Sequence, residues 1–206
     1  QMKDREANPK EDMISDLVHA HTEDGGKLTF GEAVSLVRAL IIAGNETTAT
    51  AISNLLFILA TQPAVAAQLY DNVEDERYLT RFIEELLRYA PPVRGLAKMT
   101  TRETELGGAK LPKGAHMLVL YGSGNDDERR FECPRTFDAS RGNVGNHVAF
   151  GVGIHRCIGA SLARMEIRVI KRVRNIQLAI PVEQVTYLPT VATHSIASLP
   201  ITLMRR

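Results

Sequence analysis

The sequence contains no tryptophan, only two cysteines and no excess of charge of either sign. Its 25 Lys and Arg residues face 24 Asp and Glu residues, so the formal net charge of +1 creates no global field that attracts nucleic acid or an anionic membrane. Cys133 and Cys157 lie in different sequence contexts, so we expect no disulfide framework and a cytoplasmic location. A partner that binds through charge must therefore use a local patch.

The sequence also lacks a long uninterrupted apolar run. A membrane-spanning helix needs about 20 apolar residues, and the best candidate, residues 30–61, is interrupted by Arg38, Asn45, Glu46 and several threonines. We therefore do not expect a membrane protein. Thr29 and Glu32 have the spacing of a capping box and Pro63 stops the pattern, so residues 30–61 are predicted to form one helix, buried on most sides.

The remaining composition is that of one globular domain over residues 1–206, with 44% hydrophobic and 24% charged residues. Apolar spacing predicts further helices over residues 9–22, 64–71, 78–89 and 160–173. Short apolar runs separated by glycine and proline predict strands within residues 104–124 and 177–204, with a loop over 122–147 between them. The predicted fold class is mainly α with a small β component (α+β).

One segment, "FGVGIHRCIG" at residues 150–159, combines three glycines with a single thiol. Cys157 directly precedes the helix expected from residue 160, where free backbone N–H groups favour a thiolate. Gly151 and Gly153 allow a turn against which a flat, bulky cofactor can lie, and Phe150 can shield the sulfur from water. The segment is therefore a candidate metal site with one protein ligand.

Three kinds of chemistry are open for this thiol. A zinc centre needs three or four Cys or His ligands, whereas His155 and Cys157 are a single pair and the sequence has no CxxC. A nucleophilic cysteine with His155 as its base is conceivable, but the two residues are awkwardly close on a glycine-rich loop. A haem iron held by one cysteine fits better, because the ring fills the other positions.

The fixed positions of this segment resemble the haem-binding signature of the cytochrome P450 family, the haem-thiolate monooxygenases. Those positions are Phe150, Gly153, His155, Cys157 and Gly159. Two upstream features occur in the order that the family has them. "AGNETT", residues 43–48, is similar to its oxygen-activation motif, and Glu85-x-x-Arg88 is similar to its buried charged pair.

The resemblance implies a role for each matching residue. Cys157 would be the axial ligand of haem b, Thr47 and Glu46 would deliver protons, and His155 and Lys98 would hold the haem propionates. The implied cofactor-binding residues are Phe150, Gly151, Gly153, His155, Cys157, Gly159, Lys98, Ala43 and Gly44.

Two of the motifs have structural implications as well. Small residues at Ala43 and Gly44 leave a groove for dioxygen and substrate, and Glu85 with Arg88 would brace the haem loop. The family usually has Arg or His at the position of Thr136, so the brace would need Arg135 or Arg141 instead. Lys98 stands where relatives usually have arginine, and it lacks the bidentate fork.

The match covers nearly the whole chain but only the carboxy-terminal portion of the cytochrome P450 fold. The implied enzyme inserts one oxygen atom of dioxygen into an apolar small-molecule substrate, with electrons from a ferredoxin or a flavin reductase. Nucleic acid is not an expected partner. The alternatives are a truncated or degenerate haem-binding fragment without activity, and a haem-thiolate enzyme that uses peroxide or reduces a small oxide.

Overall fold

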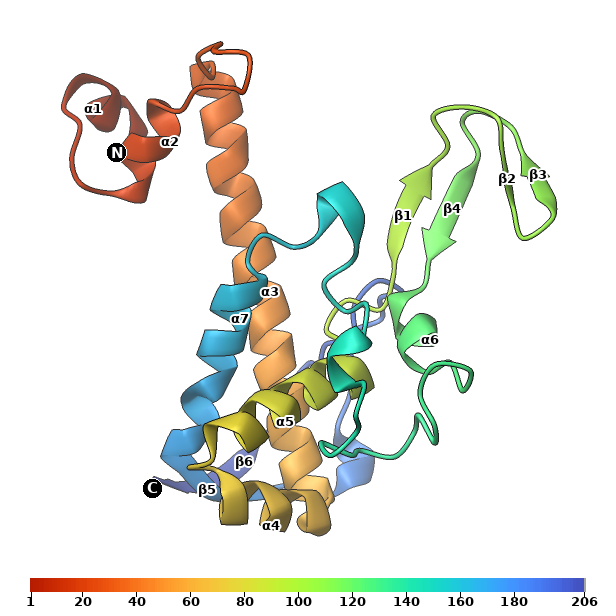
Figure 1. Cartoon of the computed structure of the whole chain (residues 1–206). Coiled ribbons are helices and arrows are strands. Elements are labelled where there is room, and N and C mark those ends of the chain that lie inside the picture. The colour runs from red at the N-terminus through yellow and green to blue at the C-terminus, as the bar shows by residue number, and fades with distance from the viewer. Residues whose placement is uncertain (206) are drawn as a thin grey trace. The chain divides into compact units, whose positions relative to one another are not determined.

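The computed structural model describes residues 1–205 (Figure 1). The chain divides into two compact units, Gln1–Glu46 and Thr47–Arg206. The division falls inside α3 (Phe30–Thr61), the helix predicted over the same residues. Each unit is therefore described by itself, and the expectation of a single domain over residues 1–206 stays a prediction.

The first unit contains α1 (Met2–Ala7), α2 (Met13–Val18) and the beginning of α3. The predicted helix over 9–22 is shorter in the structure because Asp12 caps α2, its side chain accepting the Ser15 N–H at 2.9 Å. The capping box before α3 is present. The Thr29 N–H donates to Glu32 Oε2 at 2.8 Å, and the Glu32 N–H donates to Thr29 Oγ1 at 3.3 Å.

The expectation that α3 is buried on most sides is wrong for residues 38–46, which are all exposed. Ile41 and Ile42 each leave 64% of their surface open to solvent. Within the second unit the same helix does bury a face, through Ala51, Leu55, Ile58 and Leu59. The apolar pattern predicted a buried helix correctly only where other elements pack against it.

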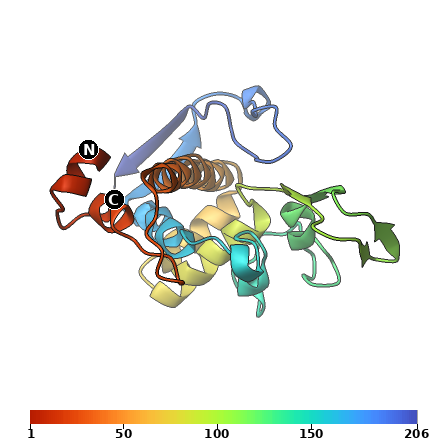
Figure 2. The same cartoon turned by 90° about the horizontal axis from the view of Figure 1, so that it is seen from above.

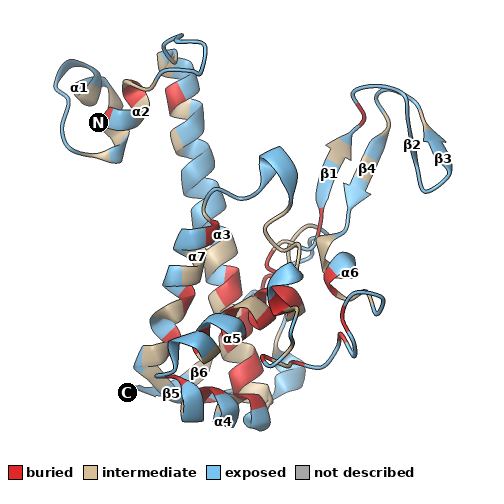
Figure 3. Ribbon diagram, in the orientation of Figure 1, coloured by how far each residue is buried: buried red, intermediate tan, exposed pale blue. Residues whose placement is uncertain are grey.

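The core of the second unit forms between α3, α4 (Pro63–Asn72), α5 (Glu76–Tyr89) and α7 (Ala160–Ile167). Figure 2 shows these other helices on one side of α3 and strands β5 and β6 on the other. α5 contributes most, with Leu79, Phe82, Ile83, Leu86 and Leu87 all nearly inaccessible (Figure 3). Each such side chain contributes about 1.5–3 kcal/mol to folding, so α5 is the best-anchored helix of this unit.

Within residues 1–205 the strands form three two-stranded antiparallel sheets. β1 (Leu96–Met99) pairs with β4 (His116–Val119), β2 (Thr104–Leu106) with β3 (Ala109–Leu111), and β5 (Val173–Leu178) with β6 (Ile201–Arg205). The β2–β3 turn uses Gly107 and Gly108, both at positive φ. The predicted mainly α fold with a small β component is confirmed.

Two segments differ from the sequence pattern. The expected loop over 122–147 contains α6 (Tyr121–Asn125) and a 3-10 turn at Val144–Asn146. The helix expected over 160–173 is α7 followed by a 3-10 turn, Arg168–Arg172.

Among residues 1–205, no helix alone is long and apolar enough to cross a bilayer. Only α3 and α4 together are long and apolar enough, and they are bent by 108° relative to each other.

Candidate functional site

The cysteine loop, residues 150–159, is closed by a hydrogen bond of its own. The N–H of Cys157 donates to the carbonyl oxygen of Phe150 at 2.9 Å. Gly151 and Gly153 have φ values of +68° and +72°, in the left-handed region that a side chain makes costly. α7 begins at Ala160, three residues after the thiol. The glycines thus serve the turn that the sequence predicted for them.

The thiol of Cys157 is exposed, and exposed apolar side chains flank it. Val152, Ile154 and Ile158 leave 70%, 97% and 90% of their surface open. A Cβ built on Gly159 would lie 3.8 Å from the sulfur, so the backbone after the thiol passes close to it. An open thiol with an apolar rim fits a large, flat and largely apolar cofactor.

The donor set of the described chain does not fit a zinc centre. No group of three or more His, Cys, Asp or Glu side chains in residues 1–205 is arranged to hold a metal ion. A metal at Cys157 would therefore need most of its ligands from a non-protein group, as a haem supplies them.

The other expected haem contacts lie on separate elements. His155 is exposed in the cysteine loop, and Lys98 is half-buried on β1, paired in register with Met117 of β4. No contact described for residues 1–205 joins Lys98 to the cysteine loop. The assignment of His155 and Lys98 to the haem propionates stays a prediction.

The oxygen-activation motif lies within α3, as expected. Ala43, Gly44 and Glu46 are exposed and belong to the first unit, whereas Thr47 is half-buried and belongs to the second. A Cβ built on Gly44 meets no atom within 4 Å, because this residue is exposed, and the groove expected beside it stays a prediction.

Glu85 and Arg88 form a fully buried ion pair, with side chains 0% and 1% exposed. Arg88 Nε donates to Glu85 Oε2 and Nη2 to Oε1, both at 2.8 Å. Bidentate geometry of this kind offsets the cost of burying two charges. The pair that alone would be a surface salt bridge is here part of the core.

Arg141, not Arg135, completes this network where Thr136 cannot. Arg141 Nε donates to Glu85 Oε1 at 3.1 Å, and its Nη2 donates to the carbonyl oxygens of Cys133 and Thr136, each at 2.8 Å. Arg135 instead pairs with Asp126 at 3.2 Å, with its own side chain 90% exposed. The sequence offered both arginines, and the fold selects one.

The network extends to the start of the cysteine loop through Asn125 of α6. Arg88 Nη1 donates to the Asn125 carbonyl oxygen at 2.9 Å. The side-chain Oδ1 of Asn125 accepts the N–H of Val148 at 2.8 Å. The buried pair is therefore two hydrogen bonds away from the backbone that enters the loop, and its role as a brace of that loop stays a prediction.

A second charged cluster, which the sequence patterns did not reveal, lies beside the first. Glu84 Oε1 accepts from Arg164 Nε at 2.5 Å, and Oε2 accepts from Arg164 Nη2 at 2.8 Å and from His147 Nε2 at 3.0 Å. Burial raises the pKa of Glu84, but the hydrogen bonds from Arg164 and His147 outweigh it and lower the pKa to about 2. His147 and Arg164 are 63 and 80 residues from Glu84, so no local spacing could have shown it.

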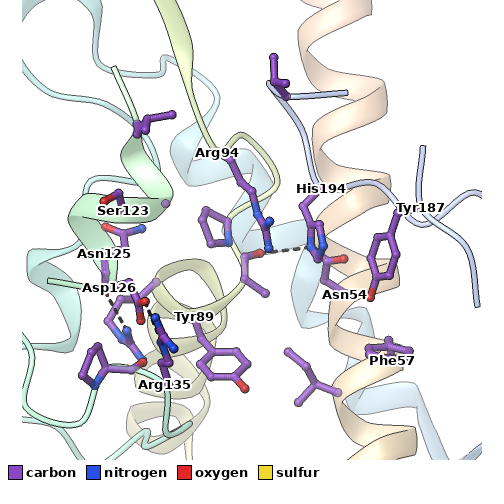
Figure 4. A pocket seen from close by; sticks show the side chains of 18 of the residues that line it. Asn54, Phe57, Tyr89, Arg94, Ser123, Asn125, Asp126, Arg135, Tyr187 and His194 are labelled. Carbon is purple, nitrogen blue, oxygen red and sulfur yellow. Dashed lines mark hydrogen bonds and ion pairs between the residues drawn. The ribbon is translucent and has the colours of Figure 1, made fainter. Parts of the chain in front are cut away.

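A cavity of about 670 Å³ opens elsewhere in the second unit, between the end of α3, α5 and the segment around His194 (Figure 4). The Tyr187 and His194 rings stack at one side, 4.3 Å apart, and Arg94 lies nearby. Burial lowers the pKa of His194, and the positive charge of Arg94 lowers it further. Its described lining includes no residue of the cysteine loop, so it is separate from the candidate haem site.

Comparison with known proteins gives a consistent result. The family model described as "Cytochrome P450" matches residues 1–173. "Cytochrome P450 144" of Mycobacterium tuberculosis is 38% identical over 166 residues, 81% of this chain and 37% of that protein. "Cyclomarin C epoxidase CymV" of Salinispora arenicola is 39% identical over 165 residues, 80% of this chain and 40% of that protein.

The solved structures agree. Substrate-free cytochrome P450 CYP150A6 of Mycobacterium marinum superposes with a TM-score of 0.90 at 32% identity, over 99% of this chain and 52% of that one. This likeness confirms the fold that the sequence resemblance implied. The chain spans less than half the length of the two curated relatives described above.

Proposed function

Because the chain belongs to the cytochrome P450 family, we propose that it is the haem-bearing portion of a monooxygenase with Cys157 as its axial ligand. The observation that carries this proposal is the exposed thiol in a self-closed glycine loop, directly before α7. Haem is the cofactor that membership of the family implies. We propose haem b as its form.

When bound, the haem supplies the iron at which dioxygen is activated. The protein's part is to hold and shield it. The exposed side chains of Val152, Ile154 and Ile158 beside Cys157 offer apolar surface to the ring, and Phe150 is half-buried at the start of the loop. His155 and Lys98 are the residues we assign to the two propionates, where a positive charge or an N–H donor is needed.

Proton delivery is assigned to α3. The Thr47 hydroxyl and the Glu46 carboxyl are consecutive on this helix, next to the small residues Ala43 and Gly44. An alcohol and an acid at such a point can hold and pass a proton to a bound reactant. The small residues at Ala43 and Gly44 would leave a groove there for dioxygen and an apolar substrate.

The proposed reaction inserts one oxygen atom of dioxygen into an apolar organic molecule. A name such as cyclomarin C epoxidase, carried by one relative, supports oxygen insertion as the reaction class. Electrons would come from a ferredoxin or a flavin reductase. The unpaired state of both Cys133 and Cys157 supports a reducing cytoplasm as the place of action.

An absorption spectrum of the reduced, carbon monoxide-treated protein tests the ligand assignment. A thiolate-ligated haem gives a strongly red-shifted Soret band, which we expect from the wild type and not from Cys157→Ser. Cys133→Ser is the matched control, because Cys133 is also an exposed, unpaired cysteine. A haem-loaded wild type without the band, or a Cys157→Ser variant that keeps it, would contradict the proposal.

A further inference from the structure

The cluster of Glu84, His147 and Arg164 is half-buried and nearly charge-balanced. Their side chains are 12%, 2% and 27% exposed. Both carboxylate oxygens of Glu84 accept from Arg164, and one also from His147. A half-buried pair with this much hydrogen bonding stays ionised, and removing either partner leaves a charge in a partly desolvated site without its counter-charge.

His147 connects the cluster to the backbone that leads into the cysteine loop. Its Nδ1 accepts the N–H of Ala149 at 3.2 Å, so the Nε2 that meets Glu84 is the nitrogen that donates. The next amide, that of Val148, donates to Asn125 on α6. Residues 147–149 are therefore held from α5 on one side and from α6 on the other.

Arg164 connects the cluster to the loop itself. Its guanidinium carbon lies 4.5 Å from the centre of the Phe150 ring, within the range of a cation–π contact. The Phe150 carbonyl oxygen accepts the Cys157 N–H, so Arg164, Phe150 and Cys157 are in one chain of contacts. The hydrogen bond to Glu84 raises the pKa of Arg164.

We propose that Glu84, His147 and Arg164 are positioning residues for the cysteine loop, and that the balance of Glu84 against Arg164 sets how readily a haem at Cys157 accepts an electron. This inference rests on the proposed function. A positive charge near a cofactor favours its gain of an electron, and a negative charge opposes it. In the wild type the two charges largely cancel.

The reduction potential of the haem-loaded protein tests the electrostatic part. Glu84→Gln leaves the charge of Arg164 uncompensated, so we expect a higher potential. Arg164→Gln leaves Glu84 uncompensated, so we expect a lower one. The double variant should return close to the wild-type potential. Arg164→Lys keeps the charge without the bidentate fork, so its potential should be closer to that of the wild type than the potential of Arg164→Gln is.

Glu76→Gln is the matched control. Glu76 is also on α5 and also pairs with basic residues that follow α7, Arg168 and Lys171, but it is exposed and away from the loop. It should leave the potential unchanged. A purely structural role would shift both single variants in the same direction or neither, and either result would overturn the inference. If Arg164→Gln does not retain haem, the other two variants decide. The potential of Glu84→Gln should then lie above that of the wild type and of Arg164→Lys, and a potential that does not would overturn the inference.

Hydrogen exchange in the haem-free chain tests the positioning part. We expect the amides of Ala149 and Cys157 to exchange about tenfold faster in Glu84→Gln than in the wild type or in Glu76→Gln. Equal exchange would overturn this part. The two proposals can be contradicted independently. A haem-loaded wild type without the red-shifted band contradicts Cys157 as ligand. A normal band together with equal potentials in Glu84→Gln and Arg164→Gln contradicts only the present inference.

Discussion

At the scale of the residue, the backbone of Cys157 is bonded within its loop, while its side chain and the apolar side chains around it are exposed. Its backbone N–H donates within the loop, to the Phe150 carbonyl oxygen, whereas the residue itself is exposed. The exposed isoleucines at 154 and 158 are unfavourable in water and become useful only against an apolar ligand. These features make the loop costly to keep without a cofactor.

Thr47 allows a direct test of the proposed proton relay. In the haem-loaded protein, Thr47→Ala should lower the product formed per electron consumed by about tenfold or more, because positioned proton transfer contributes at least that much. Electron consumption and product are measured together. Thr48→Ala, the neighbouring half-buried threonine, is the control and should stay coupled. Unchanged coupling in Thr47→Ala would remove Thr47 from the relay.

At the scale of the element, α5 organises the second unit. Its apolar face supplies much of the core, and Glu84, Glu85 and Arg88 reach out from it to three other segments. The segment 131–141 has no regular secondary structure, yet it is tied to α5 where Arg88 donates to the Pro134 carbonyl oxygen and Arg141 donates to Glu85. Arg141 also donates to two carbonyl oxygens within the segment. Side-chain hydrogen bonds there replace the bonds that a helix or sheet would make.

Arg141→Gln should therefore destabilise the protein much more than a typical surface change. Removing one partner of a buried charge network costs about 3–5 kcal/mol, and the Arg141 side chain is only 8% exposed. Arg135→Gln, on the same segment but 90% exposed, should cost less than about 0.5 kcal/mol. Urea unfolding measures both. Equal effects would mean that Arg141 does not take part in the brace.

Sequence patterns predicted elements and pairs that depend on local spacing. The capping box at Thr29 and the stop at Pro63 bounded α3 correctly, and the i, i+3 spacing of Glu85 and Arg88 identified an ion pair. α6 was missed because its five residues include two glycines, so tertiary contacts such as those of Asn125 and not propensity must hold it.

Burial and long-range partners could not be predicted in the same way. Whether Glu85 and Arg88 are buried depends on residues 125–141, and the choice of Arg141 over Arg135 depends on how that segment folds back. The cluster at Glu84 joins residues from three parts of the chain. The exposure of residues 38–46 reflects what packs against the helix, which periodicity does not report.

At the scale of the whole molecule, the carboxylate of Glu84 couples stability to pH. The pKa of Glu84 falls from an ordinary 4.5 to about 2 in the folded chain. A lowered pKa gives stability that is fully present above the unfolded value and is lost as the pH falls through the folded value. Between about pH 4.5 and pH 2, the chain should lose the contribution of this residue, which is about 3 kcal/mol at neutral pH.

The test compares urea unfolding of the wild type and Glu84→Gln from pH 7 to pH 2.5. The variant should start less stable at pH 7 and should show a shallower loss of stability on acidification, so that the two curves converge. Parallel curves would show that another carboxylate controls the acid transition.

The neighbouring positions of Glu84 and Glu85 constrain how the chain can change length during evolution. Successive residues on a helix point about 100° apart. Glu84 therefore faces Arg164, whereas Glu85 faces Arg88 and Arg141. An insertion or deletion of one residue within Glu76–Arg88 would rotate the helix surface and mismatch both networks at once. We expect homologous chains to vary in length at Val73–Asp75, before α5, and to keep α5 itself free of gaps.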